Sequence, residues 1–533
     1  MVNQSEKVRV RVAPSPTGAM HLGLARTALY NWLFCRAQGG RFVLRIDDTD
    51  AGRNLDESLE PILRGLRWLG IEWNEGPGVG GPHAPYFQSQ RAERHAAVVE
   101  LLLERGAAYL DYATAEETRA EREQAIAEKR STRYSRRWMG DTEARRRQFE
   151  AEGRKPVVRL RMPESGTLVL DDLVRGRVEF DWSLEQDHVV RRADGSCLYH
   201  LASIVDDHDM DISHIIRAEE HLSNTPRQVF IARALGWALP KFCHLPYVAE
   251  PGSKNKLSKR KLEQYARNRD FAELVAIGRK VAPALGLVPD APALNPVSIE
   301  FYELTGFVPA ALVNYLALLG WALDDRTEHF ERDELARAFT LDRVNRAPAS
   351  FDPGRLLAFQ TRHMLGLAVE ARVELVLPFL VRAGLAGEPA GDAERHRVGA
   401  ILEAAGDRVK VGADILDYRG FFTSDDRLEY DEAAFRKRLL KPGVAELLAR
   451  FRERLAAQQR FDAASHEDTL NRFVVEAGIK VGDVIHALRV AVTGKAVGFG
   501  VFETLAILGR DSSLARIDRA LAMAREAGSE DTR

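Results

Sequence analysis

Hydrophobic and basic residues alternate at the start of the chain. Between residues 7 and 12 every second position is valine and the others are Lys or Arg, a period of two that predicts a β-strand. The stretch APSPTGAM at residues 13–20 follows, and its prolines and glycine predict that the strand ends in a tight turn. From Leu22 apolar residues recur at helical spacing, which predicts a helix over about residues 22–37. His21 and Gly23 are therefore expected at a helix N-terminus, where free N–H groups and the helix dipole can receive an anion such as a phosphate.

Strands and helices continue to alternate up to about residue 110. The run RFVLRIDDTD at residues 41–50 predicts a second strand, so the order is strand, helix, strand, which is typical of a mostly parallel sheet. Ligands of such sheets bind at the carboxyl ends of the strands. A charged helical segment then extends to about residue 155, and short β-rich runs follow. From about residue 301 the apolar periodicity predicts helices, and the Pro- and Ala-rich residues 281–296 predict a linker.

Composition narrows the class of protein. A chain of 533 residues exceeds one hydrophobic core and predicts three to five domains. We find no long uncharged apolar run and no signal peptide in the sequence, so we expect no membrane segment. The cysteines Cys35, Cys197 and Cys243 lie far apart and offer neither a disulfide framework nor a Cys-x-x-Cys metal pair. The cytoplasm is therefore the expected location.

Charge gives only a local hint of nucleic acid. The net charge is −2, which excludes a polycationic protein but not a basic face. Residues 122–155 are rich in arginine, and by themselves they are best interpreted as a solvated helical face with interspersed Glu.

Two short clusters that are far apart in the sequence have the chemistry to bind one nucleotide. His21 can donate to a phosphate oxygen, and Gly23 lets a flat base approach the backbone. The run KLSKR at residues 256–260 brings two lysines and an arginine, which can neutralise the charge that grows on a triphosphate as it breaks. Each cluster alone is common on protein surfaces, so the interpretation depends on the pair.

These motifs resemble those of bacterial glutamyl-tRNA synthetases, which are class I aminoacyl-tRNA synthetases with signatures named HIGH and KMSKS. The resemblance includes APSPTGAMHLGLARTALYNWLF, RFVLRIDDTD, YHLASIVDDHDMDISHIIRAEEHLSNTP and KLSKRK, and it continues downstream through LRVAVTGKAVGFGVFETLAILG. It implies that L-glutamate attacks the α-phosphate of ATP and that the glutamyl-adenylate is then captured by the 3′-terminal ribose of tRNA(Glu). It also implies that the first step needs bound tRNA.

The resemblance assigns roles to individual residues. It implies that His21 contacts the ATP phosphates, Gly23 the adenine region and Lys259 the pyrophosphate in the transition state, with Mg²⁺ arriving together with ATP. Lys256, Ser258 and Arg260 would shape and charge the closing loop. The residues that match the family's amino-acid pocket are Arg11, Ala13, Ser15, Asp47, Tyr199, Ser203 and Arg217. A dicarboxylate needs cationic partners, which Arg11 and Arg217 can supply.

The sequence departs from the family at several of these positions. Asp47 replaces a usual Glu that faces the substrate ammonium, and being one methylene shorter it is expected to need a bridging water. Ser203 replaces a usual Asn. Asp111 and Ala113 stand where many relatives carry a Cys-x-Cys, so we predict no zinc. Residues 263–296 have the character of an insertion.

The resulting fold prediction is multidomain, α/β followed by all-α. We expect a Rossmann-like parallel-sheet catalytic domain at residues 1–110 and 191–265, interrupted by an acceptor-arm-binding domain at 111–190. An insertion and stem-contact region would follow at 266–330, and a helical anticodon-binding region at 331–533. We expect a monomer. Two alternatives remain, a non-discriminating enzyme that also glutamylates tRNA(Gln) and a catalytically inactive tRNA-binding paralogue.

Overall fold

The computed structural model describes residues 8–16, 18–49, 55–258 and 261–530. The chain divides into two compact units. The N-terminal unit contains Met1–Leu262, Val297–Glu300 and Leu312–Pro353, whereas the C-terminal unit contains Glu263–Pro296, Phe301–Ala311 and Gly354–Arg533. None of the described helices is long and apolar enough to cross a bilayer.

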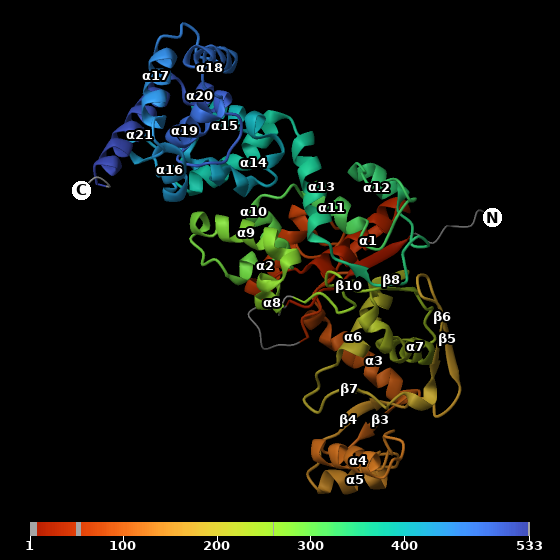
Figure 1. Cartoon of the computed structure of the whole chain (residues 1–533). Helices are drawn as coiled ribbons and strands as arrows, with labels where there is room; N and C mark the ends of the chain where they lie inside the picture. The colour runs from red at the N-terminus through yellow and green to blue at the C-terminus, as the bar shows by residue number, and fades with distance from the viewer. Residues whose placement is uncertain (1–7, 17, 50–54, 259–260, 531–533) are drawn as a thin grey trace, which may run out of the picture. The chain divides into compact units, whose positions relative to one another are not determined.

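A four-stranded parallel sheet forms the centre of the N-terminal unit (Figure 1). Its order is β2–β1–β8–β9. The strands are β1 (Arg9–Val12), β2 (Arg41–Leu44), β8 (His214–Ala218) and β9 (Lys241–Leu245). Because β1 and β8 are neighbours, the carboxyl ends that carry Arg11 and Arg217 lie at one edge of the sheet. The prediction of an N-terminal parallel sheet is confirmed.

Helix α1 (Leu22–Ala37) follows β1 after the proline-containing turn. The apolar residues that predicted it are buried, with Leu22, Ala25, Leu29 and Leu33 fully shielded from solvent. His21 is its N-cap residue. The sequence therefore fixes both the start of this helix and the face that it buries, since apolar residues at this spacing form one stripe.

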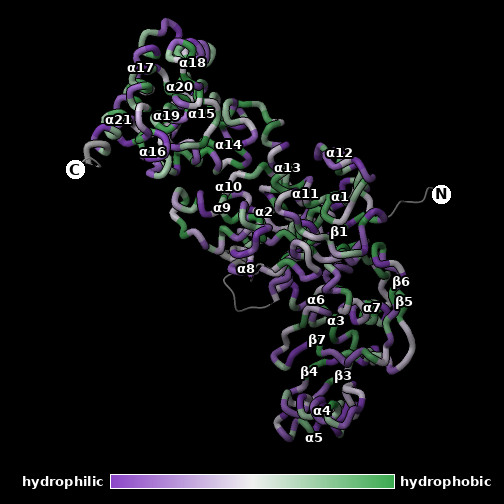
Figure 2. Tube along the Cα trace, viewed as in Figure 1, coloured by the Kyte–Doolittle hydropathy of each residue, from purple (hydrophilic) through white to green (hydrophobic). Residues whose placement is uncertain are grey.

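Antiparallel strands occur between residues 108 and 191. The strands β3 (Ala108–Asp111), β4 (Val157–Leu160) and β7 (Val189–Arg191) form one sheet, and β5 (Thr167–Asp172) pairs with β6 (Gly176–Asp181) in a hairpin. The charged helices α4 (Ala115–Ala127) and α5 (Glu143–Ala151) lie between β3 and β4 in sequence. Both are mostly hydrophilic (Figure 2), and each has one buried residue, Ala125 and Phe149.

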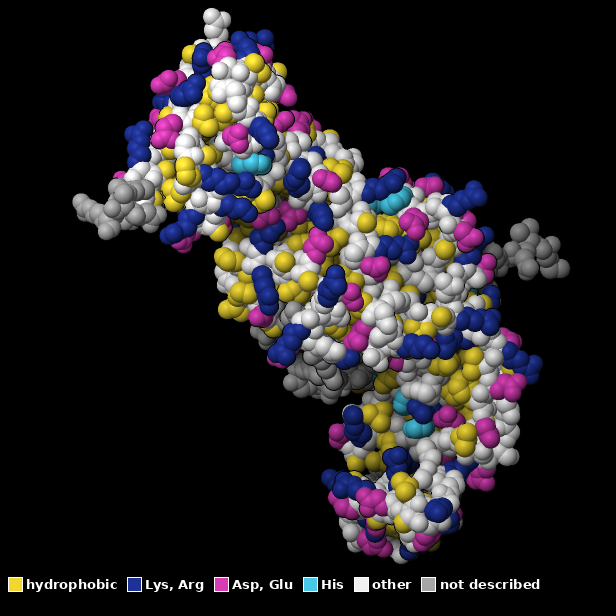
Figure 3. Space-filling model, viewed as in Figure 1, with side chains coloured by type: hydrophobic (Ala, Val, Ile, Leu, Met, Phe, Trp, Pro, Cys, Tyr) yellow, Lys and Arg dark blue, Asp and Glu magenta, His cyan; other side chains and the backbone are white. Residues whose placement is uncertain are grey.

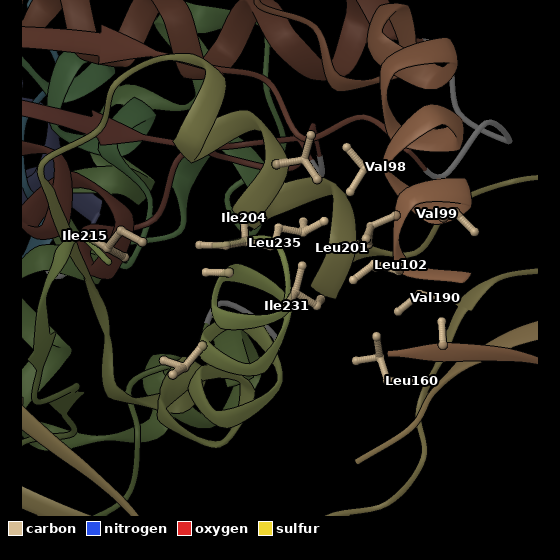
Figure 4. Packing of buried hydrophobic residues seen from close by; sticks show 14 of the residues in the cluster. Val98, Val99, Leu102, Leu160, Val190, Leu201, Ile204, Ile215, Ile231 and Leu235 are labelled. Carbon is tan, nitrogen blue, oxygen red and sulfur yellow. The ribbon is translucent and has the colours of Figure 1, made fainter. Parts of the chain in front are cut away.

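One hydrophobic core joins these strands to the helices of the parallel-sheet region. Leu102 of α3 (Ala92–Glu104), Leu160 of β4 and Leu201 of α6 (Tyr199–Asp209) are fully buried in it (Figure 4). Ile231 of α7 (Thr225–Ala234) and Ile215 of β8 belong to the same core. Burial at roughly 25 cal/mol per Å² of apolar surface makes this shared core the main stabilising contribution of the region.

Further elements complete the N-terminal unit. The two-stranded parallel pair β10 (Val248–Ala249) and β11 (Ala349–Ser350) connects distant parts of the sequence. The remaining helices wholly in this unit are α2 (Leu55–Trp68) and α12 (Arg332–Ala338). The helices α8 (Leu262–Arg267), α10 (Ile299–Thr305), α11 (Pro309–Ala317) and α13 (Pro353–Gly366) include residues of both units.

The C-terminal unit contains helices and no strand among its described residues, as the apolar periodicity predicted. Leu448, Leu470, Leu488, Leu505 and Ile517 come from five different helices and are all fully buried in one core. The α-helices of this unit are α9 (Ala272–Val281), α14 (Val369–Arg382), α15 (Asp392–Ala405), α16 (Glu432–Leu439), α17 (Val444–Ala456), α18 (Ala463–Ala477), α19 (Gly482–Thr493), α20 (Val501–Leu508) and α21 (Arg510–Glu530).

The prediction of a linker at residues 281–296 is wrong. Val281 and Leu294 are buried, and Pro283 and Pro292 each begin a short 3₁₀ turn. The whole of Glu263–Pro296 belongs to the C-terminal unit. Proline is compatible with the first position of a helical turn, so a Pro- and Ala-rich segment can pack against a core as well as link domains.

Candidate functional site

A cavity of about 340 Å³ lies in the N-terminal unit where β1 and β8 end and α1 begins. Eight of the residues that the sequence nominated line it together, although they come from segments far apart in the chain. These are Arg11, Ala13, Ser15, His21, Gly23, Tyr199, Arg217 and Lys256.

His21 caps helix α1 with its own side chain. The backbone N–H of Leu24 donates to Nδ1 of His21 over 3.1 Å. When Nδ1 accepts, the hydrogen of a neutral imidazole is on Nε2, so the other ring nitrogen is a donor. The cap therefore selects the tautomer that can donate to a phosphate oxygen.

Gly23 leaves little room for a side chain. A Cβ at this position would come within 3.1 Å of the His21 imidazole atoms Cε1 and Nδ1. A larger residue would press on the capping histidine, so glycine both keeps the backbone accessible and preserves the geometry of His21.

Arg11 belongs to a buried ion-pair network. The Nε and Nη2 atoms of Arg11 donate to the two carboxylate oxygens of Asp207 over 3.0 and 3.2 Å. Arg45 also donates to Asp207, over 2.6 Å. Burial raises the pKa of Asp207, but the two guanidinium groups outweigh burial and lower it, so this carboxylate stays ionised. Arg11 and Arg45 therefore share Asp207, and Arg45 also pairs with a second carboxylate, that of Asp47.

Arg217 on β8 is the second cation of the cavity. Its Nε donates to Nε2 of His244 over 3.0 Å and its Nη2 donates to the hydroxyl of Thr225 over 2.8 Å. Its Nη1 is buried without a hydrogen-bond partner among the described residues. Burial lowers the pKa of Arg217 to about 10, which still leaves it protonated at neutral pH. A buried guanidinium with an unused donor favours an anionic ligand.

His244 and Asp172 orient Arg217, and the sequence reasoning missed both. His244 donates from Nδ1 to Asp172 over 2.7 Å, which leaves Nε2 to accept from Arg217. Asp172 ends the hairpin strand β5 and also accepts from the backbone N–H of Arg175. The only signal for them in the sequence was that each is a polar residue within an apolar run.

Tyr199 and His221 form the wall of the cavity next to Arg217. Their rings are 6.0 Å apart between centroids. Burial, followed by the charge of Arg217, lowers the pKa of His221 to about 4, so this imidazole is neutral at physiological pH. It can therefore serve as a hydrogen-bonding group but not as a cation.

Asp47 and Ser203 do not line the cavity. Arg45 donates from Nε to Asp47 over 2.8 Å and from Nη2 to the hydroxyl of Ser203 over 3.5 Å, and all three residues are buried. Burial raises the pKa of Asp47 although Arg45 opposes the shift. The structure thus places both residues next to Arg45 behind the cavity, and the contact of Asp47 with the substrate ammonium stays a prediction.

The start of the lysine loop (residues 256–260) reaches the same cavity, although it is far from His21 in the sequence. Lys256 and Leu257 line the cavity, whereas the half-buried Ser258 follows them outside its lining. Lys256 forms an ion pair with Glu220, which also lines the cavity. Burial raises the pKa of Glu220, but Lys256 outweighs burial and lowers it. Lys259 and Arg260 lie outside the described residues.

Most arginines of the segment 122–155 are already paired. Arg136 donates to Asp187 and Glu164, and Arg154 donates to Glu117 and Glu152. The pair of Arg136 with Asp187 is largely buried and that of Arg154 with Glu117 is half-buried, and both neutralise charge that a phosphate would otherwise meet. On the face seen in Figure 3, Lys and Arg side chains are likewise interspersed with Asp and Glu.

No metal-binding cluster of His, Cys, Asp or Glu occurs in the part of the chain that the structure describes. Asp111, which we expect to stand in place of a zinc ligand, accepts hydrogen bonds from Tyr134 and Arg159 over 2.6 Å each. The buried carboxylate of Asp111 is thus occupied by an ion pair with Arg159 and a hydrogen bond from Tyr134. The absence of zinc stays a prediction.

A second cavity, of about 660 Å³, lies in the C-terminal unit. Three aromatic rings stack in its wall, with centroid distances of 5.5 Å between Tyr418 and Phe499 and 5.4 Å between Phe421 and Phe499. The basic residues that line it are Arg419, Arg427, Arg489, Lys495 and Arg516. Aromatic and arginine side chains are the groups on which proteins stack single-stranded RNA bases.

Comparison with known proteins agrees with this geometry. Residues 7–275 match the family "tRNA synthetases class I (E and Q), catalytic domain", and residues 371–521 match the family "Anticodon binding domain". The parallel sheet, the His21 helix start and the lysine loop are thus the catalytic domain of a class I aminoacyl-tRNA synthetase. Relatives that match over nearly the full length show which family of class I synthetases the chain belongs to.

Two glutamate–tRNA ligases are each 40% identical to the chain. The one from Moorella thermoacetica matches over 98% of this chain and 99% of its own length, and the one from Desulforudis audaxviator over 97% of each. The crystal structure of a glutamate tRNA ligase from Elizabethkingia meningosepticum, in complex with its amino acid, has a TM-score of 0.82 and 30% identity over 97% of this chain and 99% of that one. The chain belongs to the glutamate–tRNA ligase family.

Proposed function

We propose that this enzyme ligates L-glutamate to tRNA(Glu) through a glutamyl-adenylate that it forms from ATP. The observation that supports this most directly is that one cavity holds Arg11, Arg217, His21 and Lys256. Two guanidinium groups suit a dicarboxylate, and an imidazole and an ammonium group suit a triphosphate.

The charge of the cavity favours glutamate over glutamine. Arg217 has no carboxylate within ion-pair distance among the described residues, and Arg11 shares Asp207 with Arg45. A neutral side-chain amide would leave Arg217 buried and uncompensated, which costs several kcal/mol. The side-chain carboxylate of glutamate removes that cost.

The reaction needs positioning and charge stabilisation more than covalent catalysis. Nε2 of His21 would donate to the phosphates of ATP, and the lysine loop would neutralise the charge of the leaving pyrophosphate. Mg²⁺ is expected to enter with ATP and to balance the phosphate charge. The role assigned to Lys259 in this loop stays a prediction.

We propose that the anticodon is bound at the C-terminal cavity that Tyr418, Phe421 and Phe499 line. Its arginines suit the phosphates of single-stranded RNA, and the half-buried Tyr418 is the ring that a splayed base would reach, since Phe421 and Phe499 are buried. Whether this region accepts only tRNA(Glu) or also tRNA(Gln) distinguishes a discriminating enzyme from a non-discriminating one. We further propose that the enzyme is a cytoplasmic monomer.

The deciding experiment offers purified tRNA(Glu) and tRNA(Gln) to the enzyme, each with glutamate and with glutamine. Glutamylation of tRNA(Glu) alone is the expected result. Glutamylation of both tRNAs would identify a non-discriminating enzyme, and charging with neither amino acid would refute the proposal in favour of an inactive tRNA-binding paralogue.

A further inference from the structure

Arg26 lies on α1, three residues after Gly23, and lines the same cavity. Residues three apart share a face of a helix, and three residues advance the helix by roughly 4.5 Å. Arg26 is therefore about one helical turn beyond Gly23, whose missing side chain leaves the backbone accessible. It is only 2% exposed.

Arg26 uses a minority of its donors within the protein. Its Nη1 donates to the carbonyl oxygen of Pro246 over 2.6 Å. Its Nε and Nη2 are buried without a hydrogen-bond partner among the described residues. Its guanidinium carbon lies 4.7 Å from the ring centroid of Tyr30, and no carboxylate of the described residues pairs with it. Unsatisfied buried donors of a charged group are costly, so such an arrangement favours a ligand that accepts from them.

The surrounding chain leaves room for this guanidinium. Gly320 has a φ of +98°, and a Cβ at this glycine would be 2.7 Å from Nη2 of Arg26. Any other residue would collide with the guanidinium and would also be strained in its backbone. The position of Arg26 is thus determined by α1, by Pro246 and by Gly320 together.

The place of Arg26 in the cavity indicates which part of a nucleotide it would meet. His21 and Lys256 are the lining residues whose chemistry suits the phosphates of ATP. Arg26 is five residues further along α1 than His21, roughly 7.5 Å along the helix axis. It shares the lining of the cavity with Gly23, over which a flat base can lie, and with Val248 and Leu257. A base that lay over Gly23 would therefore be next to Arg26.

We propose that Arg26 binds the adenine of ATP by donating from Nε or Nη2 to a nitrogen of the purine ring. Adenine has acceptors at its ring nitrogens, and a guanidinium can donate to them in the plane of the base. The proposal depends on the use of ATP, which the family implies. It does not depend on which tRNA is charged.

The test replaces single acceptor atoms of the ligand. The dissociation constants of ATP and of 1-deaza-, 3-deaza- and 7-deaza-ATP are measured by calorimetry for the wild type and for Arg26→Gln. We expect one analogue to bind the wild type about tenfold or more weakly, as a charged hydrogen bond predicts. We expect Arg26→Gln to weaken ATP to a similar extent and to bind that analogue no worse than ATP.

The proposal would be overturned if the losses of affinity caused by Arg26→Gln and by the analogue were additive. It would also be overturned if the wild type bound all three analogues as tightly as ATP. Arg26→Lys keeps the charge and serves as a second variant if the glutamine variant does not fold. The matched control is Arg36→Gln on the same helix, an exposed arginine outside the cavity, which should bind all four nucleotides like the wild type. Because binding is measured without tRNA or amino acid, a failure of the glutamylation assay would be separate from a failure of this proposal.

Discussion

His244 sets the orientation of Arg217. The imidazole accepts from Nε of Arg217 over 3.0 Å and donates to Asp172 over 2.7 Å, so its tautomer is fixed by the carboxylate behind it. Burial lowers the pKa of His244, which keeps the imidazole neutral and able to accept. Arg217, which we assign to the carboxylate of the substrate, is thus held by two side chains in series, His244 and Asp172.

Arg217→Gln should reduce kcat/KM for glutamate by roughly 100-fold or more, because truncating one partner of a buried charge pair costs 2 to 5 kcal/mol. Activity toward glutamine, which lacks the side-chain carboxylate, should fall much less. The measurement is pyrophosphate exchange with tRNA present, at varied concentrations of each amino acid. An equal loss for both amino acids would show that Arg217 serves the shared α-carboxylate or the fold instead.

His244→Leu should raise KM for glutamate about tenfold, because the Nε donor of Arg217 loses its acceptor and the guanidinium can rotate. KM for ATP should change little, since His244 does not line the cavity. His244→Gln provides the comparison, because its amide can both accept from Arg217 and donate to Asp172. If glutamine does not restore KM relative to leucine, the orienting role is refuted.

Local periodicity predicted the framework of the site well. The alternation of valine with basic residues gave β1, the apolar spacing gave α1 from Leu22 to Ala37, and His21 is the N-cap. These features depend on contacts between neighbours in sequence, which is the information that a pattern contains. The candidate residues at the ends of β1, α1 and β8 meet at one cavity because β1 and β8 are neighbours in the parallel sheet.

The supporting contacts could not be predicted in this way. Asp207 pairs with Arg11 across 196 positions of the sequence, and Arg217 contacts His244 on the neighbouring strand β9. Only the strand order brings such residues together. Asp206 and Asp207 in the apolar stretch of α6 were a usable signal, because adjacent charges on a buried helix require partners. The linker prediction failed because composition does not reveal packing.

Acid should destabilise the N-terminal unit through His188 and His200. Burial, followed by the charge of Arg227, lowers the pKa of His188 to about 3 and that of His200 to about 4. Between these values and the unfolded value of about 6.5, the unfolded chain binds more protons than the folded protein. The free energy of unfolding therefore falls as pH drops through this window, by up to about 1.4 kcal/mol per pH unit for each histidine.

His188→Asn isolates this effect. The variant should make the dependence of unfolding free energy on pH shallower between pH 4.5 and 6, by up to about 1.4 kcal/mol per pH unit. Urea unfolding of wild type and variant at a series of pH values measures the difference between the two slopes. Parallel slopes would mean that His188 takes its proton equally in the folded and unfolded states.

The C-terminal cavity offers a test of tRNA binding that leaves the catalytic cavity untouched. Arg427 is exposed and lines this cavity. If Arg427 contacts a phosphate of a single-stranded region, Arg427→Gln should raise KM for tRNA about three- to tenfold. It should also reduce the salt dependence of tRNA binding, with the slope of log K against log salt smaller by about 0.7, while kcat at saturating tRNA is maintained.

The matched control is Arg454→Gln, an exposed arginine on α17 of the same unit that pairs with Glu476 and does not line the cavity. It removes the same charge from the same unit, so a general electrostatic effect would appear in both variants. Binding of tRNA(Glu) measured at several salt concentrations separates the two cases. An effect confined to Arg427→Gln places the RNA at the cavity, because only a released counterion at that phosphate changes the slope. Equal effects in both variants would mean that the unit attracts RNA through its overall charge, and the cavity would then lose its assigned role.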